Sequence, residues 1–333
     1  MNSDSHPTVI EPERREGALF FPHAFPEVRV DLGEIRMNYA NAGSSDKPAL
    51  LLIPGQSSSW WGYERAMPLL AAHFDVYAVD LRGQGRSTWT PGRYTLDNMG
   101  NDLVRFIDEV IRRPTLVSGN SSGGILAAWL AAYAKPGQVQ AVICEDAPFF
   151  ACERSPAVGP GIDDGIGPLF ALWNQYLGDQ WSKGDWPGLL AAMPTALPPH
   201  VLMAIGVMFP QPEGGQSPDP AAGPPQNLRE YDPEWGRAFV GGSATQSCNL
   251  EALLRSVGCP LLLTHHFRCA DPQTGTLAGA LTDSQAASAI DLVNGAGQPA
   301  EIISLPGMAH AMHAYAPEQF TEIVLEWAKR WLS

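Results

Sequence analysis

The stretch Gly119-Asn120-Ser121-Ser122-Gly123 places a serine between two glycines, directly after the apolar run Thr115–Val117. The Ala- and Leu-rich segment Ser122–Ala134 follows and predicts a helix. A serine on such a tight strand-to-helix turn is held in strained backbone geometry, and small neighbours let other elements approach it. The turn projects the Ser121 hydroxyl out of the sheet at a helix N-terminus, where the helix dipole favours developing negative charge. The sequence therefore predicts that Ser121 is a nucleophile.

Short apolar runs of strand length alternate with segments of helical periodicity along the chain. Runs that are apolar on both faces are typical of strands in a sheet that helices cover on each side. The predicted strands are Glu27–Leu32, Ile35–Asn41, Ala49–Ile53, Val76–Val79, Thr115–Val117, Val139–Cys144, Pro260–Thr264 and Glu301–Leu305. The predicted helices are Leu96–Ile111, Ser122–Ala134 and Pro317–Leu332. This alternation predicts an α/β fold with a doubly wound, mostly parallel sheet.

One long segment interrupts this alternation. Residues 147–257 contain no convincing strand but include four tryptophans and a Pro- and Gly-rich stretch, Pro210–Pro225. We interpret the segment as a mainly helical cap inserted after the sixth strand, with an independent second domain as the alternative. Residues 26–146 and 258–333 then form the core, and residues 1–25 form a flexible N-terminal segment.

Composition and charge exclude several classes of protein. Of 333 residues, 45% are hydrophobic and 17% are charged, which excludes wholesale disorder. The net charge of −14 opposes nucleic acid and anionic membranes as partners. The chain has five cysteines, an odd number, and no CxxC pair, which argues against a disulfide framework and against a zinc site. We therefore expect the protein to work in a reducing compartment. With a polar, charged start and no apolar run near the roughly 20 residues that span a bilayer, we expect a soluble, cytoplasmic protein. Self-association into a homo-oligomer stays open.

A serine hydroxyl needs a base to remove its proton, and the chain offers eight histidines. His310 ends the sequence Leu305-Pro306-Gly307-Met308-Ala309-His310, on a loop beyond the last predicted strand. The carboxyl ends of parallel strands meet at one edge of a sheet, so His310 can reach Ser121. His313 is the alternative base, although it is better interpreted as a neighbour that lines the site.

An acid must hold the second nitrogen of the histidine ring, and three residues are candidates. Asp146 follows the strand Val139–Cys144 and is the preferred acid, with Glu145 beside it as a further candidate. Asp271 follows the next strand and is the second choice, because it lies far beyond that strand and suits a turn before Pro272.

The tetrahedral intermediate of acyl transfer needs two converging backbone donors. The amide of Ser122 is one expected donor. The other is the amide of Gln56 in the loop Pro54–Trp61, where Gly55 lets the backbone turn sharply. The glycine-rich loop Asp80–Ser87 matches neither a GxGxxG motif nor a P-loop, so we interpret it as scaffolding. Neither a cofactor nor a metal is expected.

Taken together, these motifs resemble the α/β-hydrolase superfamily from about Glu27 to Ser333, apart from the cap. The resemblance rests on Pro54-Gly55, the Asp80–Ser87 loop, the Ser121 turn, and His310 with Pro317 seven residues later. It implies the α/β-hydrolase fold and hydrolase chemistry. Haloalkane dehalogenases and epoxide hydrolases share this fold but use an aspartate nucleophile, and Ser121 argues against both.

A narrower resemblance connects the chain with the zearalenone lactonases, which open the macrocyclic ester of an oestrogenic fungal toxin. It rests on Asn120–Gly123, Cys144-Glu145-Asp146-Ala147-Pro148 and Leu305–Met308. Asp146 in place of the glutamate of the best-known fungal type, the extra Ala309 and a longer cap depart from that pattern. The likeness of Pro233–Arg237 to a cap segment of the family implies that Trp235 packs against substrate, with an ordinary buried tryptophan as the alternative. The other residues expected beside the substrate are Gly55, Ser57, Pro148 and His313.

These observations predict a serine hydrolase that cleaves a carboxylic ester through an acyl-enzyme. The aromatic and Met-bearing cap favours a neutral, bulky, apolar small molecule, most specifically a zearalenone-type lactone. The alternatives are C–C bond hydrolysis or cofactor-free perhydrolysis on the same residues, and a non-enzymatic ligand receptor that has kept the fold.

Overall fold

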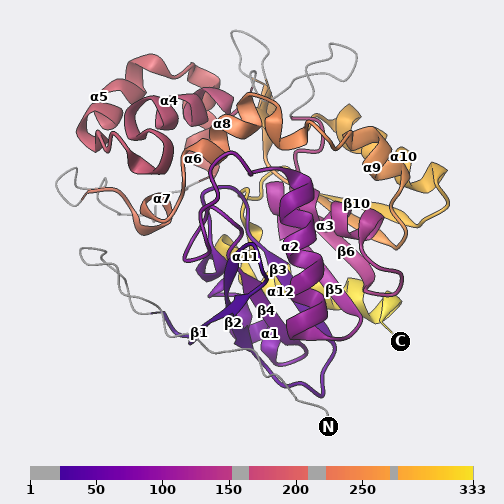
Figure 1. Ribbon diagram of the computed structural model, residues 1–333. Coiled ribbons are helices and arrows are strands. Elements are labelled where there is room, and N and C mark those ends of the chain that lie inside the picture. The colour runs from indigo at the N-terminus through magenta and orange to yellow at the C-terminus, as the bar shows by residue number, and fades with distance from the viewer. Residues whose placement is uncertain (1–22, 152–164, 209–222, 271–276, 333) are drawn as a thin grey trace.

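The computed structural model describes residues 23–151, 165–208, 223–270 and 277–332 (Figure 1). Eight strands form one sheet in the order β1-β2-β4-β3-β5-β6-β7-β10. Strand β2 pairs antiparallel with β1 and β4, and the other neighbours are parallel, which confirms the predicted fold class. The strands are β1 (Glu27–Asp31), β2 (Arg36–Ala42), β3 (Ala49–Ile53), β4 (Asp75–Val79), β5 (Thr115–Asn120), β6 (Val139–Glu145), β7 (Leu261–His265) and β10 (Ala300–Ser304).

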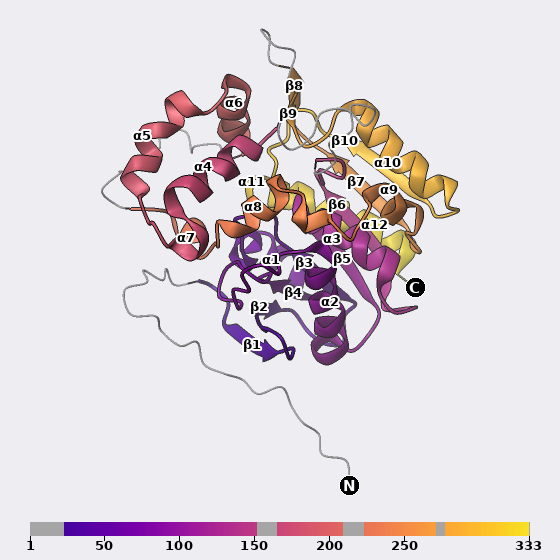
Figure 2. The ribbon, with the colours of Figure 1, turned by 45° about the horizontal axis from the view of Figure 1, so that its top comes forward.

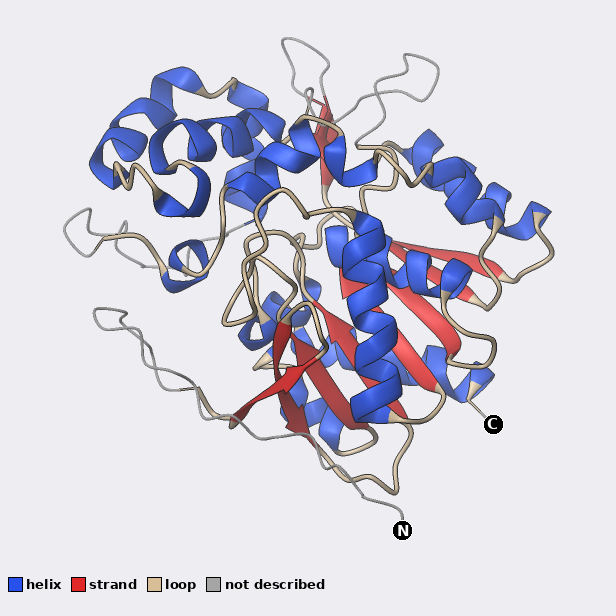
Figure 3. Ribbon diagram, in the orientation of Figure 1, coloured by secondary structure: helices blue, strands red, loops and turns tan. Residues whose placement is uncertain are grey.

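The central strands are buried on both faces because helices cover the sheet from each side (Figure 3). Helices α2 (Leu96–Phe106) and α3 (Ser122–Tyr133) pack in the hydrophobic cluster on one face. Helices α1 (Met67–Ala71) and α12 (Pro317–Trp331) pack in a second cluster on the other. The helix predicted to end at Ile111 changes to a π-helical turn over Ile107–Ile111 and stops at Arg112, whose φ is +60°.

The chain between β6 and β7 is the segment predicted as a cap. Figure 2 shows its first helices as a group beyond one end of the sheet. In the described part of this segment every regular element is helical: α4 (Gly167–Leu177), α5 (Trp186–Ala196), α6 (Pro199–Met208), α7 (Gln226–Arg229), α8 (Glu234–Val240) and α9 (Leu250–Arg255). The remaining elements follow β7: the hairpin β8 (Arg268–Ala270) and β9 (Leu277–Gly279), α10 (Asp283–Gly295), and α11 (Met312–Tyr315) after β10.

Hydrogen bonds fasten the cap segment to loops of the core. The Tyr94 hydroxyl donates to Asp232 Oδ2 at 2.7 Å, and the Asp232 amide donates to the carbonyl of Gly83 at 2.9 Å. The amide of Gly92 donates to Glu234 at 2.7 Å. Because Asp232 and Tyr94 are both buried, these bonds are shielded from competing water. The segment predicted as a cap is therefore fixed beside the Asp80–Ser87 loop.

A buried carboxylate organises that loop. Asp80 accepts hydrogen bonds from the backbone amides of Trp60 and Arg86, at 2.8 and 2.9 Å, and from the Asn38 side chain at 2.8 Å. Burial raises the pKa of Asp80 to about 7 despite these donors. Gly85 closes over it at a φ of +54°, and a Cβ there would lie 2.2 Å from the Asp80 carboxyl group. These contacts hold the loop in place from within.

Candidate active site

Ser121 occupies a sharp turn between β5 and α3. Its φ of +55° is a conformation that residues with a side chain rarely adopt. Two glycines, Gly119 and Gly123, permit the turn because the helix crosses the strand at very short range. A Cβ on Gly119 would lie 2.0 Å from the Gly123 carbonyl oxygen, and one on Gly123 would lie 2.3 Å from that of Ile53. The glycines thus fix the angle at which Ser121 leaves the sheet.

Asp146 stands at the end of the neighbouring strand, β6. Its buried carboxylate is 2.6 Å from Nδ1 of His310 through Oδ2 and accepts the backbone N–H of His266 at 2.9 Å through Oδ1. The chain turns sharply here as well, since the φ of Asp146 is +46°. The structure therefore brings Asp146 to His310, whereas Glu145 contacts His313. The alternative acid Asp271 lies outside the described residues.

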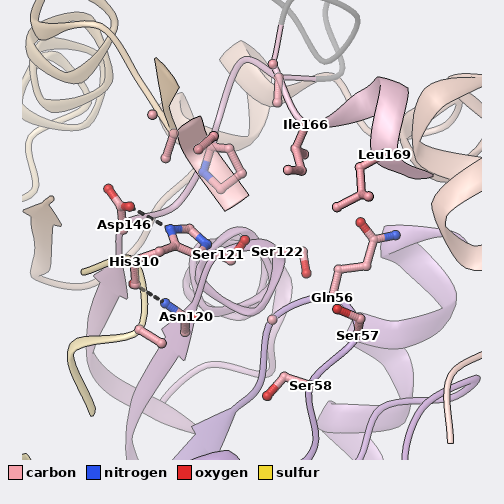
Figure 4. A pocket seen from close by; sticks show the side chains of 18 of the residues that line it. Gln56, Ser57, Ser58, Asn120, Ser121, Ser122, Asp146, Ile166, Leu169 and His310 are labelled. Atoms are coloured by element: carbon pink, nitrogen blue, oxygen red, sulfur yellow. Dashed lines mark hydrogen bonds and ion pairs between the residues drawn. The ribbon is translucent and has the colours of Figure 1, made fainter. Parts of the chain in front are cut away.

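His310 lies on the loop after β10, and a hydrogen bond holds its backbone. Its carbonyl accepts the Asn120 side-chain amide at 2.9 Å, which ties the loop to the residue before Ser121. In Figure 4 the imidazole ring lies between Asp146 and Ser121, with one nitrogen toward each. Residues from three strand ends therefore meet at one edge of the sheet, as the parallel arrangement predicts.

His266 supports this arrangement, and the sequence analysis did not single it out for this role. Its ring is buried and contacts the Ala309 carbonyl through Nδ1 at 2.9 Å and the Thr264 hydroxyl through Nε2 at 2.8 Å. With its backbone amide on Asp146, His266 thus positions both the acid and the loop of His310. Its place directly after β7, at the same sheet edge, is the sequence feature that could have identified it.

Burial and charge act against each other in the Asp146–His310 pair. Burial opposes the charged form of both groups. For His310, the hydrogen bond and charge of Asp146 and the charge of Glu145 outweigh burial, and its pKa lies above the usual 6.5. For Asp146, the hydrogen bond from His310 and the charges of His266 and His310 hold the pKa below its usual value. Asp146 is thus a stable anion behind the imidazole.

The two amides predicted to bind an oxyanion flank Ser121. Ser122 opens α3, and Gln56 follows β3 in a loop that runs close to the turn, since a Cβ on Gly55 would lie 2.9 Å from Cβ of Ser121. Within the described ranges neither amide donates to a protein acceptor. The carbonyl of Ser57 accepts the Asn227 side chain at 2.9 Å, so a cap residue holds this loop. The arrangement leaves two backbone donors beside the Ser121 hydroxyl.

A cavity of about 370 Å³ opens above these groups. Ser121, His310 and Asp146 line it, and so do four of the predicted substrate neighbours: Gly55, Ser57, Pro148 and His313. Its apolar wall comes largely from the cap, through side chains that the sequence analysis did not single out: Ile166, Leu169, Phe170, Trp173 and Phe239. Figure 4 shows Ile166 and Leu169 across the cavity from the serine. The cavity thus has polar side chains on the side of Ser121 and apolar side chains on the opposite side.

The expectation that Trp235 packs against substrate is wrong. Its side chain is completely buried and is not part of the cavity wall. It stacks on Phe239, with ring centroids 5.1 Å apart, and would lie 3.0 Å from a Cβ on Gly83. Trp235 therefore fills the junction between cap and core, one layer behind the wall that Phe239 provides.

The described residues contain neither a metal-binding cluster nor a single membrane-spanning helix. In those ranges no three His, Cys, Asp or Glu side chains gather in a way that could hold a metal ion. No single helix there is long and apolar enough to cross a membrane. One pair, Trp186–Ala196 with Pro199–Gly206, reaches that length and composition only jointly and is bent by 118°.

Comparison with known proteins supports the fold and the general chemistry. The chain is 28% identical over 98 residues to 3-oxoadipate enol-lactonase 2 of Acinetobacter baylyi, and 30% identical over 118 residues to epoxide hydrolase 4 of Homo sapiens. These matches cover 29% and 35% of this chain, and only 37% and 32% of the two relatives.

Solved structures match over much more of the chain. The enol-lactonase from Burkholderia xenovorans LB400 superimposes with a TM-score of 0.60 at 17% identity, over 90% of this chain and 99% of that one. A hydrolase from Pseudomonas aeruginosa PA01 gives a TM-score of 0.58 at 20% identity, over 92% and 99%. At such identities the likeness shows the fold alone. The sequence profile of the alpha/beta hydrolase family matches residues 50–323, and the chain therefore belongs to that family.

Proposed function

We propose that this protein is a serine hydrolase that cleaves carboxylic esters through an acyl-enzyme. The observation that carries the proposal is the Asp146–His310 pair, at 2.6 Å, with its ring directed at Ser121 on the floor of a cavity. A carboxylate behind an imidazole holds the ring in the tautomer whose free nitrogen can accept the serine proton. A strained turn whose serine lines the cavity supplies the nucleophile.

In the proposed reaction His310 removes the proton of Ser121 while the serine oxygen attacks the ester carbonyl. The carbonyl oxygen becomes negative and is stabilised by the amides of Gln56 and Ser122, which stand ready without rearrangement. His310 then gives its proton to the leaving alcohol, and the ester bond breaks. In the second half, His310 activates a water molecule that releases the acid from Ser121. Asp146 stabilises the imidazolium formed in each half.

The cavity supports a bulky, neutral and apolar substrate. Its cap wall consists of aliphatic and aromatic side chains, which favour an uncharged ligand with a large apolar surface. Among esters we propose a lactone, of the zearalenone type, as the preferred substrate class. The similarity to a 3-oxoadipate enol-lactonase over part of the chain favours ring opening as well.

Two assays test the proposal at its two levels. Hydrolysis of p-nitrophenyl acetate and butyrate would establish an esterase, while activity on a diketone but on neither ester would establish C–C hydrolysis instead. Loss of zearalenone fluorescence on incubation with the protein would establish the narrower substrate class. Ester turnover with unchanged zearalenone fluorescence would restrict the function to ester hydrolysis on another substrate.

The pH dependence of the reaction follows from the charge state of His310. The ring must be neutral to accept the Ser121 proton, and its pKa lies above 6.5. We therefore expect kcat/KM to fall as the pH decreases through a value above 6.5. In the Asp146→Asn protein burial remains but the carboxylate charge is lost, so the midpoint of this fall moves to a lower pH. A pH series of kcat/KM for both proteins measures the shift; a midpoint that moves upward would contradict the electrostatic account.

A further inference from the structure

A second carboxylate–imidazole pair lies next to the first. Glu145, the last residue of β6, holds Nδ1 of His313 at 2.8 and 3.0 Å from its two oxygens and accepts the backbone N–H of His313 at 3.1 Å. The side chains are 0% and 3% exposed. Burial of such a pair is costly, and replacing it with apolar side chains is often neutral or stabilising. The reaction proposed above uses neither group.

His313 lines the cavity, and its Nε2 is the ring nitrogen that does not face Glu145. Tyr63 stacks on the His313 ring, with ring centroids 3.9 Å apart, and Phe320 contacts the ring in a T-shaped arrangement. Two aromatic side chains therefore hold the ring in place. Nε2 makes no hydrogen bond to a described residue, and His313 lines the cavity. A Cβ on Gly62 would lie 3.7 Å from Nε2 and 2.8 Å from the Ser58 hydroxyl, and Ser58 also lines the cavity. The glycine at position 62 thus leaves room for the Ser58 hydroxyl beside this ring.

The contact with Glu145 decides which nitrogen of the His313 ring faces the carboxylate. The charge and hydrogen bonds of His313 hold the pKa of Glu145 below its usual value despite complete burial, so Glu145 is an anion that only accepts. A single proton on the His313 ring therefore sits on Nδ1, directed at Glu145, and Nε2 then carries the lone pair.

Two neighbouring strand-end carboxylates therefore bring two imidazoles to one cavity. Glu145 and Asp146 are adjacent in the chain, and so their Cα atoms are about 3.8 Å apart. The histidines that they hold are three residues apart, and both line the cavity with Ser121. An oxygen atom that receives its proton from His310 is thus formed in a cavity that also contains a second group able to accept a hydrogen bond.

We propose that the Glu145–His313 pair binds the hydroxyl group that ring opening of a lactone releases, and so holds it away from the acyl-enzyme. The inference rests on the ester hydrolysis proposed above. When Ser121 attacks, the bond between the carbonyl carbon and the ring oxygen breaks, and the serine proton passes through His310 to that oxygen. The resulting hydroxyl stays tethered at high effective concentration, and its attack on the acyl-serine would re-form the lactone. A hydrogen bond from it to Nε2 of His313 leaves the carbonyl to water.

A matched pair of substrates isolates this role. Dihydrocoumarin and phenyl propanoate both release a phenol from a propanoyl-type ester, but only in dihydrocoumarin does the phenol stay tethered. We expect His313→Phe to lower the ratio of kcat/KM for dihydrocoumarin to that for phenyl propanoate about tenfold, the scale of one hydrogen bond. Added methanol, which captures the acyl-enzyme, should raise dihydrocoumarin opening more in the variant than in the unmodified protein.

Two further variants separate binding from packing. Phe320→Leu disturbs the contacts of the His313 ring but keeps both nitrogens, so the ratio should stay within twofold of the unmodified protein. In Glu145→Gln the side-chain oxygen still accepts the His313 amide, which directs the new NH₂ group at Nδ1 and moves the ring proton to Nε2. This variant should therefore lower the ratio as His313→Phe does.

Three results would overturn the inference. An unchanged ratio in His313→Phe would reduce the pair to a structural element, as would an equal fall in Phe320→Leu. Hydrolysis of phenyl propanoate without any opening of dihydrocoumarin by the unmodified protein would remove the tethered hydroxyl itself. If the unmodified protein hydrolyses neither ester, the proposed ester hydrolysis fails, and the inference fails with it.

Discussion

Replacement of Ser121 with alanine is expected to reduce kcat for p-nitrophenyl ester hydrolysis by about 10⁶-fold. The cause is chemical, because Ser121 is the residue that lies beside the His310 ring in Figure 4. Alanine can occupy the same backbone conformation as serine, so the thermal midpoint should change by no more than a few degrees. Stopped-flow and steady-state assays, with a melting curve of each protein, measure both quantities.

Ser118 provides a matched control on the same strand. It is buried on β5, and its hydroxyl has no hydrogen-bond partner among the described residues and lies outside the cavity wall. Ser118→Ala should therefore keep kcat within about twofold. An Ser121→Ala protein that retains the full rate would contradict the acyl-enzyme and direct attention to a different nucleophile.

Asp146→Asn should lower kcat by about 10⁴-fold, the scale of a lost triad carboxylate. Asparagine keeps one oxygen for the amide of His266 and so turns its NH₂ group toward Nδ1 of His310. The ring proton must then move to the nitrogen that faces Ser121, which can no longer accept the serine proton. Steady-state rates at several pH values measure the loss.

Asp271→Asn is the informative comparison for that experiment. Because Asp146 already occupies Nδ1 of His310 at 2.6 Å, we expect Asp271→Asn to change kcat by no more than a few-fold. A large loss in Asp271→Asn with a normal rate in Asp146→Asn would show that the acid comes from the loop after β7.

The pattern of apolar residues along the sequence predicted the buried strands, because their burial depends on their own side chains. The run Ala49–Ile53 is a strand with the bounds expected from its five apolar residues, because all five are buried. The strand β6 extends to Glu145, one residue beyond its apolar run. The charged Glu145 is stable at that position because it pairs with His313. These two residues are 168 positions apart in the sequence. No local pattern can reveal such a partner.

The cap illustrates the same limit. Its helical character was evident from composition, but which aromatic side chains face the cavity depends on how the helices dock. Phe170 and Phe239 line the cavity, whereas Trp235 faces the Gly83 loop. All three are large apolar residues in helices. Only the packing of α4 and α8 against the core decides which of them line the cavity and which are buried away from it.

The positive φ of Ser121 presents its hydroxyl to the cavity but lowers the stability of the fold. A side chain held in this conformation costs of order 1 kcal/mol or more, and glycine would relieve that cost while removing the hydroxyl. Directed evolution that selects only for heat resistance would therefore favour Ser121→Gly, which is inactive. Such an experiment needs a second selection for catalytic turnover.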